Sequence, residues 1–173
     1  ISAATTKKRD NFHRMVEDAK AGLFDLVITK EITRFARNTL DSIQYTRELL
    51  DFLRENNIPV TFFLVGNRIK EFSGTVQQTV KDGHEMGYHS YAHKMQTGLS
   101  DAQILSDFEK SNELLRELTG AEFTLWRTPG GGYNQRVLDA VPLPHIMWTV
   151  DTRDWETRNT TAVYNSIIRN SDD

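Results

Sequence analysis

The chain has 173 residues, of which 38% are hydrophobic and 26% are charged, and its net charge is -3 at pH 7. This length suits one domain with a substantial core. The charge balance gives no general attraction to nucleic acid or to an anionic membrane, and no run of about 18 apolar residues could span a bilayer. The absence of cysteine excludes disulfides, thiolate metal sites and a cysteine nucleophile.

Helix-like and strand-like patterns alternate along the first half of the chain. Apolar residues recur at helical spacing over residues 12–19, and residues 23–29 form a short apolar run typical of a buried strand. A long helix is predicted from Asn38 or Thr39 to Asn56, and residues 59–65 predict a second buried strand.

The alternation continues toward the middle of the chain. A helical pattern extends to about Lys81, the pair at 82–83 predicts a turn, and a short strand leads into His89. The run from Ser100 to Gln103 is a capping box, so a helix begins there and ends at Gly120.

Two further strands are predicted over residues 123–126 and 146–150, and Asn159 or Thr160 could cap a last helix. Strands that alternate with helices of ten or more residues favour an α/β fold with mainly parallel strands and surrounding helices. Active sites in such folds lie at the carboxyl ends of the strands. Polar residues that follow the strands are therefore the candidates for function.

Three polar motifs follow three of these strands: residues 89–93, 127–130 and 151–155. Two histidines four positions apart, His89 and His93, can share one metal ion and leave an open side for water. An arginine and an aspartate, Arg127 and Asp154, could orient the groups around that water. Together these residues outline a metal-dependent hydrolase. The other histidines are predicted to be structural: His13, His84 and His145.

Four segments, LLDFLRENNIPVTFFLVGNRI, DGHEMGYHSYAH, LWRTPGGGYN and VDTRDWE, occur in this order from about residue 49 to the end. They resemble the polysaccharide deacetylase family, also called NodB homology or carbohydrate esterase family 4. The resemblance implies an incomplete or distorted (β/α) barrel. It also implies removal of acetyl groups from a carbohydrate polymer with the help of a divalent metal, zinc above all.

The resemblance assigns a role to each candidate residue. His89 and His93 match the metal ligands, and Arg127 matches the arginine that orients the catalytic carboxylate. Further catalytic roles fall to Gly130, whose amide would face the oxyanion, and to Asp154, which would hold the arginine. The substrate groove would include Pro129 and Trp155, although Trp155 could equally be a core residue.

Two motifs of the family are missing from this sequence. The Asp-Asp pair, which supplies the general base and the third metal ligand, is replaced at the matching strand end by Lys30 and Glu31. Glu31 is a candidate replacement ligand. The Leu-x-His motif, which supplies the acid, is also absent. Weak activity or none is therefore expected.

Residues 1–48 resemble part of the catalytic domain of a serine recombinase, or resolvase. Arg34 and Arg37 match the paired arginines that contact the scissile phosphate there, as remnants of a DNA contact. The strand with the nucleophilic serine is absent, and no clustered basic face indicates nucleic-acid binding. The chain therefore looks like a chimera of a recombinase-like βα segment, 1–48, and a truncated deacetylase-like domain, 49–173, packed as one globular unit.

Several alternatives stay open from the sequence. The chain could be a folded chimera without enzymatic function or, less favoured, a recombinase-derived DNA module. A carbohydrate polymer is the expected partner if the domain is active, and no membrane partner is expected. An open sheet edge would pair with another chain, which favours a homo-oligomer formed by segment exchange. No signal peptide is recognised, the compartment is left open, and the deacetylase part suggests a secreted or cell-envelope parent.

Overall fold

The computed structural model describes residues 39–170, with side chains from residue 47 onward. The described residues fall into two compact units, one that ends at Ile146 and one that begins at Met147. The helix predicted over residues 12–19, the strand over 23–29 and the candidates Glu31, Arg34 and Arg37 lie outside the described residues.

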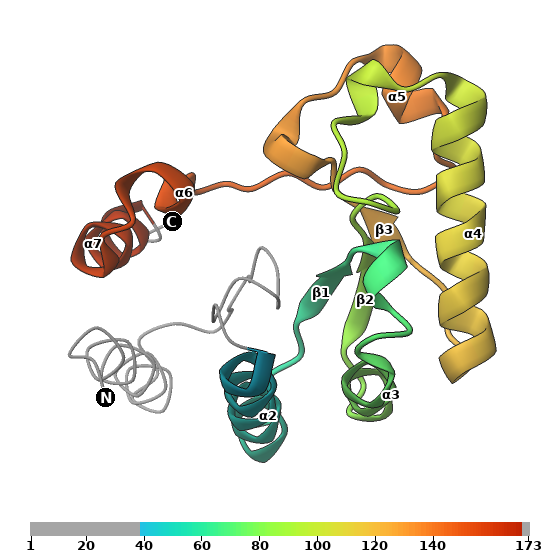
Figure 1. Ribbon diagram of the computed structural model, residues 1–173. Coiled ribbons are helices and arrows are strands. Elements are labelled where there is room, and N and C mark those ends of the chain that lie inside the picture. Colours follow the sequence, from blue (N-terminus) through green and yellow to red (C-terminus); the bar gives the residue numbers. More distant parts are fainter. Residues whose placement is uncertain (1–38, 171–173) are drawn as a thin grey trace. The chain divides into compact units, whose positions relative to one another are not determined.

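A parallel sheet forms the centre of the first unit (Figure 1). Its strands are β1 (Thr61–Leu64), β2 (Glu85–Tyr88) and β3 (Leu125–Trp126), in the order β1-β2-β3. Both pairings are parallel. The predicted α/β fold with mainly parallel strands is confirmed, and the strands alternate with helices as the periodicity indicated.

One predicted strand is wrong. Residues 146–150 form no strand, and the segment joins the sheet through a single parallel bridge between His145 and Trp126. The Trp126 amide donates to the Pro144 carbonyl at 2.9 Å, and the Ile146 amide donates to the Trp126 carbonyl at 2.8 Å. The pairing stops there because β3 is only two residues long and the chain turns away after it.

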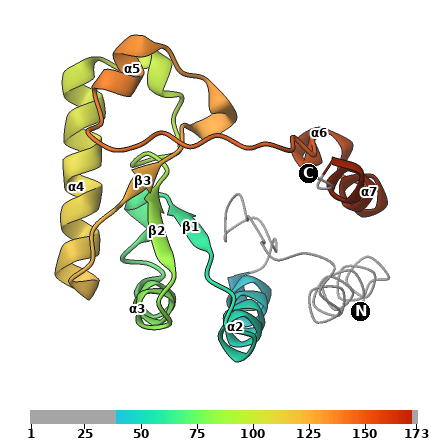
Figure 2. The ribbon, with the colours of Figure 1, turned by 180° about the vertical axis from the view of Figure 1, so that it is seen from behind.

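The described residues of the first unit form the helices α2 (Thr39–Glu55), α3 (Ser73–Lys81), α4 (Asp101–Thr119) and α5 (Gln135–Asp139). Three short 3-10 helices follow strand ends or lie in loops: η2 (Gly66–Arg68), η3 (Gln96–Gly98) and η4 (Pro129–Gly131). Helix α3 contacts both α2 and α4. Both opposite views of the ribbon show α3 between these two helices (Figures 1 and 2).

Helix α4 begins and ends where the sequence predicts. The Ser100 hydroxyl accepts from the Gln103 amide at 3.3 Å, and the Ser100 amide donates to the Gln103 side chain at 2.9 Å. These two bonds satisfy amides that have no partner within the helix. Gly120 ends the helix at φ 76°, a left-handed conformation that glycine adopts without steric cost.

The core of this unit forms around Tyr88, which is fully buried in the middle of the sheet. Its ring contacts those of Phe108, Phe123 and Trp126. Burial raises the pKa of the Tyr88 phenol well above its ordinary value, because the charged form loses hydration. Leu105 of α4 is 39% exposed although its neighbour Ile104 is fully buried, since adjacent helix positions point about 100° apart.

The second unit contains the helices α6 (Asp154–Thr157) and α7 (Thr160–Asn170). The Asn159 side chain accepts from the Ala162 amide at 3.1 Å, so Asn159 caps α7 as the sequence predicts. Among the described residues, no helix combines the length and the apolar character that crossing a bilayer requires.

Gly66 is predicted to be intolerant of a larger side chain. It is buried after β1, and a Cβ there would meet the Ser111 hydroxyl of α4 and lie 2.9 Å from the Tyr91 ring. We expect Gly66→Ala to lower the free energy of unfolding by about 1–3 kcal/mol through overpacking. Urea denaturation measures this change in the free energy of unfolding.

Gly74 in α3 provides the matched control, because a Cβ there meets nothing within 4 Å. Gly74→Ala should leave stability unchanged or raise it by up to about 1 kcal/mol, since alanine favours the helix. Equal losses in both variants would contradict the overpacking explanation.

Candidate functional site

Two candidate residues meet at the carboxyl ends of the central strands. The His89 amide donates to the Leu64 carbonyl of β1, and the Arg127 amide donates to the Tyr88 carbonyl of β2, both at 2.9 Å. The sheet hydrogen bonds therefore continue one residue beyond the strands. This continuation places the residues that follow β2 and β3 next to each other.

A hydrogen bond from the His89 ring joins these two strand ends. His89 is only 1% exposed, and its Nδ1 lies 2.8 Å from the Arg127 carbonyl oxygen. A carbonyl can only accept, so Nδ1 donates, and in the neutral ring the lone pair lies on Nε2. Orientation of a histidine by a backbone carbonyl in this way is typical of a metal ligand.

His93 reaches the same place by a turn of the backbone. Its ring centre lies 5.1 Å from that of His89, with the two rings at 64°. Ser90 and His93 both have positive φ values, 62° and 56°. The segment is not helical, and these left-handed residues fold it back so that two imidazoles four positions apart become neighbours.

The two histidines supply part of the donor set that a catalytic zinc ion requires. Such sites have three protein ligands and one open position. Among the described residues, no group of three or more His, Asp or Glu side chains could hold a metal ion. A third ligand would have to come from elsewhere in the chain, and the candidate Glu31 lies outside the described part.

Arg127 brings a buried positive charge to the site. It is 4% exposed, its Nε donates to the Ile146 carbonyl at 3.0 Å, and its guanidinium lies 4.1 Å from the centre of the Phe63 ring. Burial lowers the pKa of Arg127, although an arginine keeps its charge at neutral pH. The Phe63 ring stabilises the guanidinium through a cation–π interaction.

Phe63 was not singled out from the sequence. Its ring also lies edge-on to His89, with centres 6.3 Å apart. Its position in the strand segment TFFL indicates a buried residue, but nothing in that pattern shows that it would contact both the arginine and a histidine.

The turn after Arg127 has a conformation suited to glycine. Gly130 and Gly131 have φ values of 65° and 73°, and Gly130 is exposed. A Cβ on Gly130 would lie 3.0 Å from the Met95 sulfur. Because glycine has no side chain, the backbone at position 130 can approach a bound molecule closely. An amide that donates a hydrogen bond to an oxyanion requires such a close approach.

The remaining predicted site residues lie in different places. Pro129 is buried at the start of η4. Asp154 opens α6 in the second unit, so its pairing with Arg127 stays a prediction. Trp155, also in α6, is 52% exposed, which makes a surface role more suitable for it than a core role.

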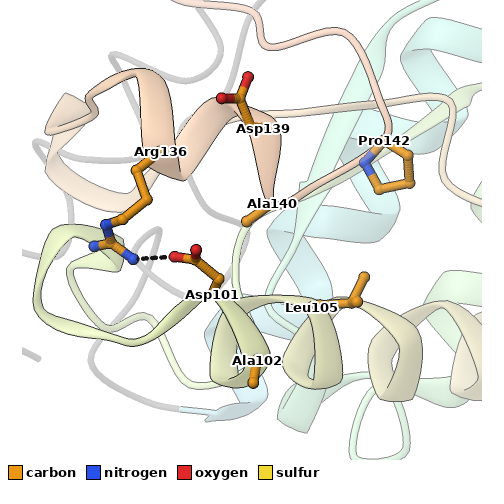
Figure 3. A pocket seen from close by; sticks show the side chains of 7 residues that line it. All are labelled: Asp101, Ala102, Leu105, Arg136, Asp139, Ala140 and Pro142. Atoms are coloured by element: carbon orange, nitrogen blue, oxygen red, sulfur yellow. Dashed lines mark hydrogen bonds and ion pairs between the residues drawn. The ribbon is translucent and has the colours of Figure 1, made fainter.

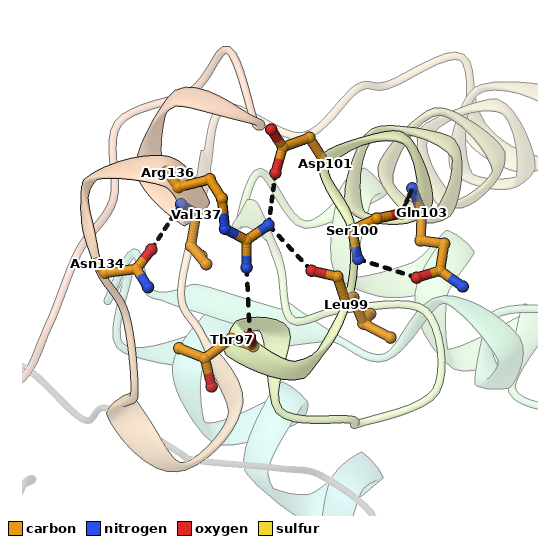
Figure 4. A network of polar contacts seen from close by, with 8 residues as sticks. All are labelled: Thr97, Leu99, Ser100, Asp101, Gln103, Asn134, Arg136 and Val137. Atoms are coloured by element: carbon orange, nitrogen blue, oxygen red, sulfur yellow. Dashed lines mark hydrogen bonds and ion pairs between the residues drawn. The ribbon is translucent and has the colours of Figure 1, made fainter.

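Arg136 connects the loop after His93 to α5 (Figure 4). From α5 it donates to the carbonyls of Leu99 at 2.9 Å and Thr97 at 3.3 Å, and it pairs with Asp101. The Asn134 side chain caps α5 by accepting from the Val137 amide at 3.1 Å. One guanidinium thus holds the loop after His93 against α5.

A hollow of about 630 Å³ lies beside this connection (Figure 3). It is lined by residues of α4, α5 and the segment after α5: Asp101, Ala102, Leu105, Arg136, Asp139, Ala140 and Pro142. Its charged lining includes the pair between Arg136 and Asp101. None of the candidate site residues lines it, so it is separate from the site at the strand ends.

Residues 38–143 match the family model for polysaccharide deacetylase. This match covers more than half of the chain. The chain therefore belongs to the polysaccharide deacetylase family. The match begins earlier than the boundary expected near residue 49, and the recombinase-like origin of residues 1–48 stays a prediction.

Curated relatives include bacterial enzymes of cell-wall modification. The chain is 32% identical over 132 residues to the peptidoglycan-N-acetylglucosamine deacetylase PgdA of Listeria monocytogenes, a match that covers 76% of this chain and 28% of PgdA. It is 29% identical over 128 residues to the peptidoglycan-N-acetylmuramic acid deacetylase PdaC of Bacillus subtilis, covering 74% of this chain and 27% of PdaC. The chain thus spans less than a third of either relative.

Solved structures agree on the fold. The structure of PdaC from Bacillus subtilis matches with a TM-score of 0.67 at 29% identity, covering 72% of this chain and 61% of that one. A family 4 pseudoenzyme from Bacillus anthracis also matches with a TM-score of 0.67 at 29% identity, covering 73% of this chain and 46% of that one. The same fold thus occurs in a deacetylase and in a pseudoenzyme.

Arg136 is predicted to contribute more to stability than an ordinary surface arginine. Arg136→Ala removes bonds to two loop carbonyls, so we expect the free energy of unfolding to fall by about 1–2 kcal/mol. Arg116→Ala is the control, because the ion pairs of Arg116 are with the exposed residues Glu113 and Glu122. That variant should stay within about 0.5 kcal/mol. Urea denaturation of both variants gives the comparison, and indistinguishable stabilities would refute the prediction.

Proposed function

We propose that this chain is a deacetylase-type carbohydrate-binding domain whose catalytic site is incomplete. His89 and His93 hold a divalent metal ion, zinc above all, beside the cationic Arg127, and acetyl hydrolysis is weak or absent. The observation that carries this proposal is the hydrogen bond from His89 Nδ1 to the Arg127 carbonyl at 2.8 Å. It orients one ligand and ties the two loops of the site together.

Each candidate residue has its own role in binding the metal or the substrate. His89 and His93 hold the metal, which when bound supplies Lewis acidity toward the acetyl carbonyl. The amide of Gly130 offers a hydrogen bond to the same oxygen as negative charge develops on it. Trp155 offers an exposed ring to a sugar face, and the pairing of Asp154 with Arg127 stays a prediction.

An N-acetylated polymer of amino sugars is the substrate class that we propose. The names of PgdA and PdaC support it, since both are peptidoglycan deacetylases acting on N-acetylated sugars. A protein with this substrate acts at the cell envelope. The proposal is limited to substrate binding by this domain, because the chain spans only part of the length of PgdA and PdaC.

The missing Asp-Asp pair is the reason for the expected low activity. Lys30 and Glu31 stand where the family has its Asp-Asp pair. Loss of a general acid or base costs roughly 10²–10⁴-fold in rate. A family 4 pseudoenzyme of which a mutant has restored activity is 30% identical to this chain, with a TM-score of 0.67. This similarity supports the proposal that the chain has the family fold and a lowered catalytic rate.

A folded chimera without enzymatic function is the alternative, and a recombinase-derived DNA module is a remoter one. Metal analysis of the purified protein separates the first alternative from the proposal. Homo-oligomerisation by segment exchange stays a prediction.

Zinc binding should depend on both histidines. We expect zinc affinity at least 10–100-fold below that of a complete family member, the scale seen when only supporting groups around a metal are lost. His89→Ala and His93→Ala should each weaken it by a further tenfold or more, roughly one lost ligand. Calorimetric titration of each metal-free protein with zinc measures these affinities.

Lys94→Ala is the control, since Lys94 is an exposed neighbour of His93 and should leave zinc affinity unchanged. Tight, stoichiometric zinc binding that survives His89→Ala would place the metal elsewhere.

Activity should be restored by returning the carboxylates. The unaltered chain should release no acetate from acetylated chito-oligosaccharides above a metal-only background. The double variant Lys30→Asp with Glu31→Asp should raise the rate by roughly 10²-fold or more, because it restores a base and a ligand. Acetate release is the measurement.

The matched control is Lys30→Asn with Glu31→Asn, which has nearly the same side-chain shapes as the double aspartate variant but carries no carboxylate. Robust turnover by the unaltered chain that His93→Ala abolishes would overturn the expectation and point to Glu31 or another carboxylate as the base.

A further inference from the structure

His145 lies between two aromatic rings beside the candidate site, although the sequence suggests only a structural histidine. Its ring centre is 4.8 Å from that of Trp126, at 66°, and 4.9 Å from that of Tyr133, at 53°. Trp126 is fully buried, whereas Tyr133 is 50% exposed. The imidazole therefore reaches from the sheet to the surface, next to the turn that follows Arg127.

One nitrogen of this ring holds the backbone of Thr128. The Thr128 amide donates to His145 Nε2 at 3.3 Å, and the Thr128 hydroxyl lies 3.3 Å from the same nitrogen. A backbone amide can only donate, so Nε2 carries the lone pair and the ring is neutral with its proton on Nδ1. Burial and the positive charge of Arg127 both lower the pKa of His145, which favours this neutral form.

Thr128 is the residue through which this bond acts on the site. It is fully buried between Arg127 and the glycine turn. On one side the Arg127 amide is bound to β2 through Tyr88, and on the other the Thr128 carbonyl accepts from the Gly131 amide at 3.2 Å. The bond to His145 is thus the anchor between the sheet and the turn that presents Gly130.

We propose that His145 is a positioning residue whose Nε2 fixes the Thr128 amide and thereby the geometry of the turn at Pro129–Gly131. The geometry of the turn is argued from this chain alone. Its use, to present the Gly130 amide to an acetylated sugar, rests on the proposed function.

A packing role for the His145 ring makes a different prediction. If the ring only fills space between Trp126 and Tyr133, then His145→Phe is the milder change, because it keeps an aromatic ring in place. If the acceptor nitrogen matters, His145→Gln is the milder change, because its amide oxygen can take the place of Nε2. The two variants therefore rank in opposite order under the two roles.

Hydrogen exchange of the Thr128 amide, followed by NMR, tests the proposal. We expect His145→Phe to speed exchange at Thr128 roughly tenfold relative to the unaltered chain, the scale of one lost hydrogen bond. His145→Gln should stay within about threefold of the unaltered chain. Nitrogen-15 shifts of the ring should show Nε2 unprotonated at neutral pH. Equal exchange at Thr128 in the phenylalanine variant, or a protonated Nε2, would overturn the inference.

Calorimetry with an acetylated chito-oligosaccharide then separates this inference from the proposed function. His145→Phe should weaken sugar binding about five- to tenfold and His145→Gln much less. Equal sugar affinity in the phenylalanine variant shows that the anchor is not used for the substrate and counts against the inference. If the unaltered chain binds no sugar, the proposed function fails, and the exchange at Thr128 still decides whether His145 holds the turn.

Discussion

The hydrogen bond between the His89 ring and the Arg127 carbonyl is the contact on which the site depends. It joins the residue after β2 to the residue after β3 at 2.8 Å, in a place where His89 is almost fully buried. A buried bond of this kind is costly to break, because its partners would lose their hydration without compensation. It therefore holds the histidine ring and the arginine loop in one arrangement.

The rest of the site is built outward from that bond by contacts of different kinds. Phe63 supports the Arg127 guanidinium, His145 holds the Thr128 amide, and Arg136 ties the loop after His93 to α5. Each contact comes from a different element of the first unit. Two of them act on Arg127 and Thr128, directly before the turn whose glycines have positive φ values.

Family membership and catalytic competence are separate properties here. The fold is shared with a deacetylase and with a pseudoenzyme at the same TM-score, 0.67. The first unit brings His89, His93 and Arg127 together, while the replacement of the family's Asp-Asp pair by Lys30 and Glu31 stays a prediction from the sequence. Binding can outlast catalysis in such a domain because ligand orientation depends on the sheet, whereas proton transfer depends on single side chains.

The sequence by itself determined the parallel α/β fold, the capped helix α4 and the motifs at the strand ends, because local periodicity and capping are properties of short segments. It failed at residues 146–150, where an apolar run predicts a strand but β3 is too short to pair with it. Only the tertiary structure decided that Phe63 supports Arg127 and that His145 holds Thr128. Those contacts join residues far apart in the chain, and their geometry arises from the order and register of the strands, which no local pattern contains.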